Sequence, residues 1–170
     1  MAPPLSIVHI DTAETFRGGQ QVLLLLARGL RARGHRQQIV CPANAKLAEA
    51  ARSEGLDWAP LTSVPKLRRM LHGAQIAHAH SGRAQNLSFF ASAGLPVRRI
   101  ATRHVAFEPR HPRIHRLKYN VTCHGIIAVS KSVQRAMAEA GVPEEKIEII
   151  PNGVEWPERT ATQEERLAAR

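Results

Sequence analysis

The sequence predicts an α/β fold, in which a mostly parallel sheet of about seven strands lies between helices in a three-layer, Rossmann-like domain. Three observations predict it: short apolar segments alternate with helix-period segments, the connections between them are short, and glycines end several of the helical segments. Right-handed crossovers then bring the carboxyl ends of all strands to one edge, where ligands bind in folds of this class. We therefore expect the functional residues at those ends.

The first strand and helix occupy residues 5–33. An apolar segment at residues 5–10 predicts the strand, and a Leu- and Ala-rich stretch from about Gly19 to Arg33 predicts the helix, which Gly34 ends. Apolar side chains at helical spacing predict the face of this helix that meets the core. These residues are Val22, Leu25, Leu26, Gly29 and Leu30.

The turn that opens this helix is suited to an anion. Gly18 and Gly19 let the chain pass close to a ligand, and the first N–H groups and the positive end of the helix dipole face the same place. Arg17 adds a guanidinium suited to phosphate oxygens. Two glycines also make an ordinary tight turn, so the residues by themselves leave both interpretations open.

The remaining elements follow from the same patterns. Further strands are expected at residues 37–41, 56–61, 75–80, 95–103, 125–129 and 146–150. Further helices are expected at residues 45–54, 64–71, 83–93, 113–124 and 131–140. Asn44 is suited to cap the second helix, and Pro60 places the third strand at a sheet edge. Residues 105–112 form an irregular loop that is a candidate for function, and residues 156–170 begin a linker and an exposed helix.

The charge of the chain favours an anionic partner. The 170 residues include 24 Lys and Arg against 14 Asp and Glu, which gives a net charge of +10 and a pI near 11.0. The arginines are dispersed, and aromatic residues are only 4% of the chain, too few for a surface on which bases stack. Nucleic acid is therefore a disfavoured partner, and a nucleotide, a phosphorylated acceptor or an anionic lipid is favoured.

Cysteine usage and apolar runs indicate a cytoplasmic protein. Cys41 and Cys123 lie far apart without metal-binding or redox spacing, as expected of buried thiols in a reducing compartment. The amino terminus shows no signal-peptide pattern, and the strongest apolar run, residues 22–27, is far shorter than the ~20 residues of a membrane span. Any membrane contact is therefore expected to be peripheral.

Several enzyme classes lack their motifs. There is no Gly-x-Ser-x-Gly elbow, no Gly-x-x-x-x-Gly-Lys-Ser/Thr loop and no Gly-x-Gly-x-x-Gly turn, which disfavours α/β hydrolases, P-loop NTPases and dinucleotide oxidoreductases. A stand-alone basic α/β module that binds a phosphorylated ligand or nucleic acid remains an alternative. Salt-dependent affinity for arbitrary duplex would indicate such a module.

An ordered set of motifs resembles the amino-terminal domain of glycosyltransferase family 4, the retaining enzymes of GT-B architecture. The resemblance extends from Ile7 to about Val154. Its motifs are Gly18-Gly19-Gln20-Gln21, His78-Ala-His80-Ser81, Thr102-Arg103-His104-Val105, Ile127-Ala-Val-Ser130-Lys-Ser, Gly141-Val-Pro and Ile150-Pro-Asn152-Gly-Val.

The resemblance implies a two-domain enzyme of which residues 1–155 are the acceptor-side domain and the carboxy-terminal nucleotide-sugar domain is absent. The reaction would transfer a sugar from a nucleotide-sugar donor to a hydroxyl of a glycan or glycolipid acceptor with retention, in lipopolysaccharide or other cell-envelope polysaccharide synthesis. An anionic membrane surface at the inner face would be a further partner. The isolated chain would be inactive.

The resemblance also implies roles for residues. Gly18 and Gly19 would lie against the donor diphosphate or the acceptor, and His104 would be the catalytic histidine near the donor sugar. Many members have Asp after that His, whereas this chain has Val105. The other candidate substrate-binding residues are Arg17, Gln20, His80, Ser81, Arg83, Arg103, Ser130 and Asn152. Among them, Ser130 is also a natural helix cap and Asn152 a turn residue.

No cofactor and no metal ion are expected. His78 and His80 are two apart on a strand and point to one face, so the pair could bind a metal. No Cys or carboxylate near them in sequence completes a site, and the resembling family generally works without a metal.

Overall fold

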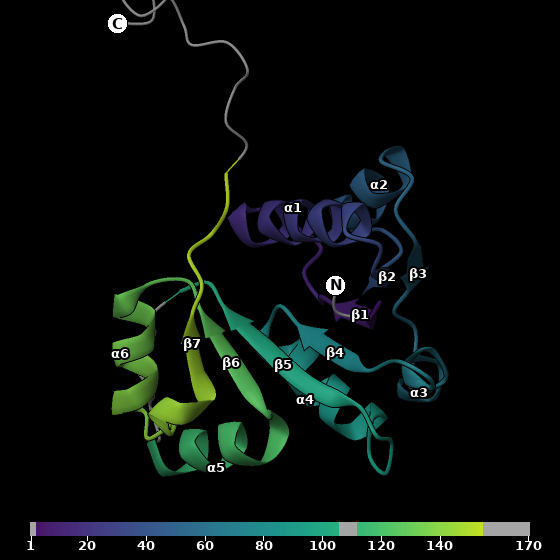
Figure 1. Cartoon of the computed structure of the whole chain (residues 1–170). Coiled ribbons are helices and arrows are strands. Elements are labelled where there is room, and N and C mark those ends of the chain that lie inside the picture. Colours follow the sequence, from purple (N-terminus) through teal and green to yellow (C-terminus); the bar gives the residue numbers. More distant parts are fainter. Residues whose placement is uncertain (1–2, 106–111, 155–170) are drawn as a thin grey trace, which may run out of the picture.

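The computed structural model describes residues 3–105 and 112–154, apart from the side chains of residues 112–115. It confirms the Rossmann-like fold class: seven parallel strands form one sheet in the order β3-β2-β1-β4-β5-β6-β7, with helices on both faces (Figure 1). The strands are β1 (Ser6–Ile10), β2 (Arg36–Cys41), β3 (Trp58–Pro60), β4 (Ile76–Ala79), β5 (Arg98–Arg103), β6 (Gly125–Ala128) and β7 (Ile147–Ile149). The strand that contains Pro60 lies at the sheet edge, as predicted.

The helices fall where the helical periodicity predicts them, within a few residues. They are α1 (Gly18–Ala32), α2 (Lys46–Ser53), α3 (Val64–Leu71), α4 (Gly82–Ala91), α5 (Pro112–Thr122) and α6 (Lys131–Glu139), with a 3₁₀ turn η1 (Glu144–Lys146) before β7. Gly34 has a φ of +82°, which places the turn after α1 in the region that favours glycine.

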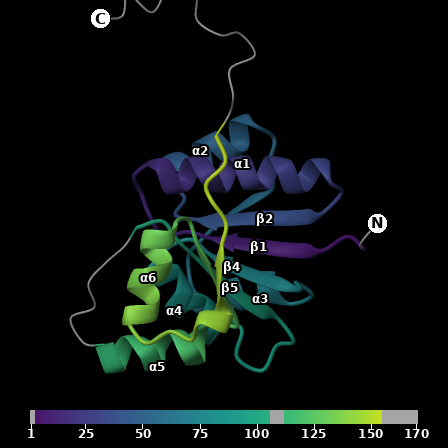
Figure 2. The ribbon, with the colours of Figure 1, turned by 60° about the vertical axis from the view of Figure 1, so that its left-hand side comes forward.

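Helices cover the two faces of the sheet unequally. The α1 and α2 helices pack over β2 and β3, and α3 to α6 lie on the other face, where most of the core is (Figures 1 and 2). Within the described ranges, no helix covers the α1 face of β6 and β7. A cavity of about 320 Å³ lies there, between α1 and the chain after β7.

The predicted core face of α1 is wrong. The helix buries Leu23, Leu24 and Ala27 against α2 and β2. The predicted stripe is only half-buried, and Val22, Leu25, Leu26 and Gly29 of it line the 320 Å³ cavity. The reason is that the helix is apolar on two adjacent sides, so periodicity alone could not distinguish the side that is covered from the side that faces a cavity.

The predicted cap of α2 is also wrong. The Ala45 amide donates to the Pro42 carbonyl at 3.1 Å in a turn, and the helix begins at Lys46, one residue later than predicted. Ala45 therefore occupies the N-cap position, without any side-chain hydrogen bond. The serines at three other helix starts do cap: Ser63, Ser81 and Ser130 accept from backbone amides. For Ser130 this confirms the capping interpretation.

Two other expectations concern thiols and membrane spans. Cys41 and Cys123 are buried free thiols, as predicted. In the described part of the chain, no helix is both long and apolar enough to span a bilayer. Residues 106–111 of the candidate loop, and the linker at 156–170, lie outside the described residues.

Candidate functional site

The Gly-Gly turn and His104 meet at the carboxyl edge of the sheet. His104 follows the last residue of β5, and Gly19 lies in the first turn of α1, the helix after β1. A Cβ placed on Gly19 would lie 3.2 Å from Cδ2 of the His104 ring. The glycine therefore lets the imidazole lie directly against the helix backbone. Two segments 85 positions apart in the sequence form one surface.

A buried carboxylate fixes the start of α1. Asp11 is fully buried, and its Oδ2 accepts a hydrogen bond from the Gln20 side-chain amide at 2.6 Å while Oδ1 accepts from the Ala13 amide at 2.9 Å. The Oε1 of Gln20 in turn accepts from the Arg17 amide at 3.0 Å. Gln20, which the sequence suggests as a substrate ligand, is thus engaged in holding the turn in place. The exposed Arg17 side chain lies at the N-cap of α1.

The His104 side chain is half-buried and has no hydrogen-bond partner for either ring nitrogen among the described residues. Its ring lies near-parallel to that of His80, with centroids 6.3 Å apart. Burial lowers the pKa of His104, the charge of Arg103 lowers it further, and Asp11 opposes both. The ring is therefore neutral at pH 7, with one nitrogen able to donate and the other to accept.

Alternation along β5 sends Arg103 to the opposite face from His104. The Arg103 guanidinium lies over the Tyr119 ring at 5.9 Å, and its Nη1 is 3.5 Å from a Cβ built on Gly82. Lys118 of α5 donates to the Gly82 carbonyl at 3.4 Å, and burial followed by the Arg103 charge lowers its pKa. Two cations therefore meet beside the first residue of α4, separate from the His104 surface.

The other candidates are spread along the rim. Ser81 caps α4 and also hydrogen-bonds the Thr12 hydroxyl at 2.8 Å. Arg83 is exposed and lines a separate cavity of about 290 Å³ beside α3. Asn152 lines the 320 Å³ cavity together with His80. The structure therefore brings Gly19, His80 and His104 together, and it does not bring Arg83 or Ser130 to them.

Two buried polar residues, His9 of β1 and Asp11 directly after this strand, are part of this region and are not among the site residues predicted from the sequence. His9 and Asp11 are both 0% exposed and two positions apart, so they lie on the same face of β1. His9 is paired in register with His78 on β4. The signal was present in the sequence: a histidine and a carboxylate that alternate in an otherwise apolar strand require buried partners.

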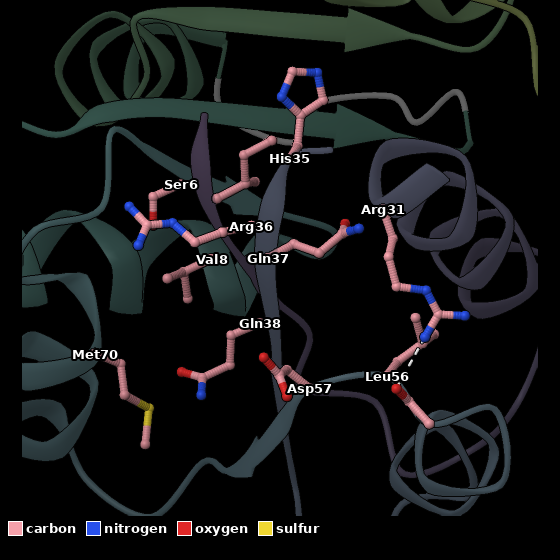
Figure 3. A pocket seen from close by; sticks show the side chains of 12 residues that line it. Ser6, Val8, Arg31, His35, Arg36, Gln37, Gln38, Leu56, Asp57 and Met70 are labelled. Atoms are coloured by element: carbon pink, nitrogen blue, oxygen red, sulfur yellow. Dashed lines mark hydrogen bonds between the residues drawn. The ribbon is translucent and has the colours of Figure 1, made fainter. Parts of the chain in front are cut away.

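A cavity of about 420 Å³ lies at the other edge of the sheet and contains none of the predicted site residues. It is lined by residues near the amino ends of β1 and β2, including Ser6, Arg36 and Gln37 (Figure 3). Arg31 at its border is engaged, since its Nη1 donates to the Gly55 carbonyl at 2.9 Å. In parallel α/β sheets ligands bind outside the carboxyl ends, so we place the site at the His104 edge.

The fold and the site together define an α/β domain of the Rossmann type. The carboxyl edge of its sheet carries a glycine turn and an imidazole that has no hydrogen-bond partner among the described residues. The family model described as Glycosyltransferase Family 4 matches residues 16–155. The chain belongs to glycosyltransferase family 4, as the sequence motifs predict. No curated protein matches the sequence significantly.

Proteins of known structure share the fold. The Anabaena protein HepE, crystallised with UDP and glucose, matches with a TM-score of 0.78 at 18% identity over 88% of this chain and 45% of HepE. A glycosyltransferase from Rickettsia africae matches with a TM-score of 0.78 at 17% identity, over 90% of this chain and 44% of its own. The lipopolysaccharide outer core galactosyltransferase WaaB matches with a TM-score of 0.66 at 14% identity, over 88% and 46%. The chain thus spans less than half the length of these proteins.

Replacing Asp11 by Asn should destabilise the protein by about 1–3 kcal/mol, because one of the two donors that now face its carboxylate would then face an NH₂ group. Urea unfolding measures the loss. Asp57→Asn, at an exposed position, is the control and should change stability little. Equal stabilities of the two variants would contradict the assigned role of Asp11.

Gly19→Val should push the His104 ring away and cost about 1–3 kcal/mol, whereas Gly18→Val, with nothing within 4 Å of its Cβ, should be tolerated. The two substitutions have the same chemistry and lie at neighbouring helix positions. The imidazole NMR signals of His104 should shift in the first variant only. A shift of the same size in both would disprove the contact.

Acid should destabilise the fold through the buried histidines. Burial lowers the pKa of His9 from 6.5 to about 4, although its hydrogen bond to Gln37 raises it. Between pH 6.5 and about 4, the unfolded chain therefore holds a proton on His9 that the folded chain does not. The free energy of unfolding falls as the pH is lowered through this range. The loss from His9 alone is about 3 kcal/mol. NMR titration of the His9 ring should give a midpoint below 5, and urea unfolding at pH 7 and 4.5 should show the loss. A normal His9 midpoint would contradict this.

Proposed function

We propose that this chain is the acceptor-side, amino-terminal domain of a retaining glycosyltransferase, which transfers a sugar from a nucleotide-sugar donor to a hydroxyl of a glycan or glycolipid. Membership of family 4 and the Rossmann-like fold support the reaction class. The observation that carries the proposal is the His104 imidazole, which is neutral, has no hydrogen-bond partner among the described residues, and is held against Gly19 at the ligand edge. Buried polar groups left without partners are uncommon and indicate a missing ligand.

The start of α1 supports a phosphate-bearing donor. The Arg17 carbonyl accepts the amides of Gln20 and Gln21 at 3.0 and 3.1 Å, so the amides of Gly18 and Gly19 are the remaining first-turn donors of this helix. A diphosphate placed there would gain from these amides, from the helix dipole and from the exposed Arg17. Negative charge develops on the departing nucleotide as the glycosidic bond breaks, so these groups would favour the transition state.

The His104 ring would act close to the sugar. A neutral imidazole can donate one hydrogen bond and accept another, which suits it to orient a sugar hydroxyl beside the reacting carbon. Because its pKa is lowered, it would not carry a positive charge that competes with an oxocarbenium-like centre. The absence of a carboxylate at Val105 leaves this orientation to the Gly19 backbone and the neighbouring His80 ring.

A second domain would supply the rest of the donor site. The chain covers only 44–46% of the proteins of known structure described above, and HepE was crystallised with UDP and glucose. We therefore place the nucleotide-sugar contacts in a carboxy-terminal domain that closes on the His104 edge, and we expect little turnover from the 170 residues alone. No resident cofactor or metal ion is needed for this transfer.

The pathway we favour is synthesis of lipopolysaccharide or another cell-envelope polysaccharide. The structures that share the fold include the lipopolysaccharide outer core galactosyltransferase WaaB. A net charge of +10 suits an anionic glycolipid acceptor at the inner membrane face, with the protein peripheral and cytoplasmic.

The test uses the protein in which this chain is joined to its nucleotide-sugar domain. With a panel of nucleotide sugars and glycolipid acceptors, His104→Ala should lower kcat by about 100-fold or more, because a positioned polar group is lost from the transition state. The exposed His72→Ala is the matched control and should leave kcat unchanged. Anomeric NMR of the product should show retention.

Three outcomes would contradict the proposal. They are equal kcat in His104→Ala and wild type, robust transfer by the 170-residue chain alone, or an inverted product. Salt-dependent binding of arbitrary duplex DNA without sugar transfer would instead support the alternative of a basic binding module.

A further inference from the structure

Three buried histidines converge on the α1 face of the sheet. His9 lies on β1, His78 on the adjacent β4 in direct register with it, and His80 two residues further on. They are 0%, 5% and 6% exposed. One ring nitrogen from each lies within 4.8 Å of the others. The parallel pairing of two strands thus brings together imidazoles that are about 70 residues apart in the sequence.

Hydrogen bonds around the cluster determine which nitrogens are available. The Gln37 side-chain NH₂ donates to the Ala27 carbonyl, so Gln37 Oε1 faces His9 Nε2 as an acceptor at 3.3 Å. His9 is thereby protonated on Nε2, and its Nδ1 accepts a hydrogen bond from His80 Nε2 at 3.2 Å. On the other side, His78 Nε2 is 2.7 Å from the Thr102 hydroxyl, which leaves Nδ1 of His78 available to bind.

This arrangement matches a metal site in two respects. Ligand nitrogens of a tetrahedral site with bonds of about 2.0–2.1 Å lie about 3.4 Å apart, close to the 3.2 Å between His9 and His80. Histidine ligands also characteristically donate their outer N–H to an amide or hydroxyl, as Gln37 and Thr102 allow here. Nδ1 of His80 is buried, and no hydrogen-bond partner for it lies among the described residues.

The chemistry of the donors selects the cation. The three donors are ring nitrogens of buried imidazoles. Neutral imidazoles bind Zn²⁺, Co²⁺, Ni²⁺ and Cu²⁺ far better than Mg²⁺ or Ca²⁺. The buried Asp11, on the same face of β1 as His9, adds a negative charge at this edge.

The cluster also has an access route. His78 and His80 line the 320 Å³ cavity whose other wall is the apolar side of α1. Zinc sites that bind a water or substrate oxygen have three protein ligands and a fourth position open to a cavity. Closed structural zinc sites have four protein ligands instead.

We propose that His9, His78 and His80 form a binding site for Zn²⁺ or a related late first-row divalent cation, with the fourth coordination position open to the cavity beside α1. The metal site shares His80 with the proposed transferase site, but the proposal does not rest on the sugar transfer, because it is read out by metal binding to this chain.

The experiment titrates the metal-stripped 170-residue protein with Co²⁺ and Zn²⁺. The wild type should bind one equivalent, and Co²⁺ should show the intense visible bands of a four-coordinate site. His78→Ala and His80→Ala should each weaken binding by about 100-fold or more, and His72→Ala, at an exposed position, should not. Mg²⁺ should not bind. Thr102→Val, which removes only the outer partner of His78, should weaken binding by about 10-fold or more.

A ligand variant that fails to fold by circular dichroism does not prevent the test. Thr102→Val keeps all three imidazoles, and X-ray absorption on the wild type with Zn²⁺ reports three nitrogens at about 2.0–2.1 Å if the site exists. Weak six-coordinate Co²⁺ spectra in the wild type, or the same affinity in wild type, Thr102→Val and the folded histidine variants, would overturn the proposal. The cluster would then be a hydrogen-bonded part of the core.

Discussion

The parallel pairing of β1 with β2 and β4 is the constraint on which the rest of this structure depends. In the observed register, His9 of β1 lies opposite Ile39 of β2 and opposite His78 of β4. Because side chains alternate along each strand, this register determines which residues of all three strands face α1. A shift of one residue in either pairing would move the histidines into the larger core on the other face. Both the glycine turn and the imidazole cluster are consequences of this register.

The same constraint explains why most of the fold was predictable. Parallel strands buried on both faces are nearly continuous apolar runs, and glycine at the helix ends separates them clearly, so all seven strands were located. The errors were local. The α1 helix is apolar on two sides, and only the tertiary structure decides that Leu23 and Leu24 face the core. At α2, the choice between Asn44 and Ala45 as N-cap depended on a turn geometry that composition does not encode.

The candidate site was predictable in its position rather than in its contacts. That Gly19 and His104 share an edge follows from strand topology. Side chains alternate between the two faces of a strand, so Arg103 and His104 point to opposite faces. This separation is overlooked when the two neighbouring residues are treated as one motif. Asp11 and His9 could not be assigned partners from sequence, because their partners, Gln20 and His80, are brought to them by different elements.

The uncovered α1 face of β6 and β7 has a consequence for local dynamics. Strands between two helical layers lose their hydrogen bonds only when much of the domain opens, whereas the described residues place helices on one side only of these two strands. Backbone amides of β6 and β7 are therefore expected to exchange with deuterated solvent sooner than those of β1, in the middle of the sheet. With such a difference in local stability, β6 and β7, near Asn152, would change conformation when another protein surface binds there. The middle of the sheet would stay rigid.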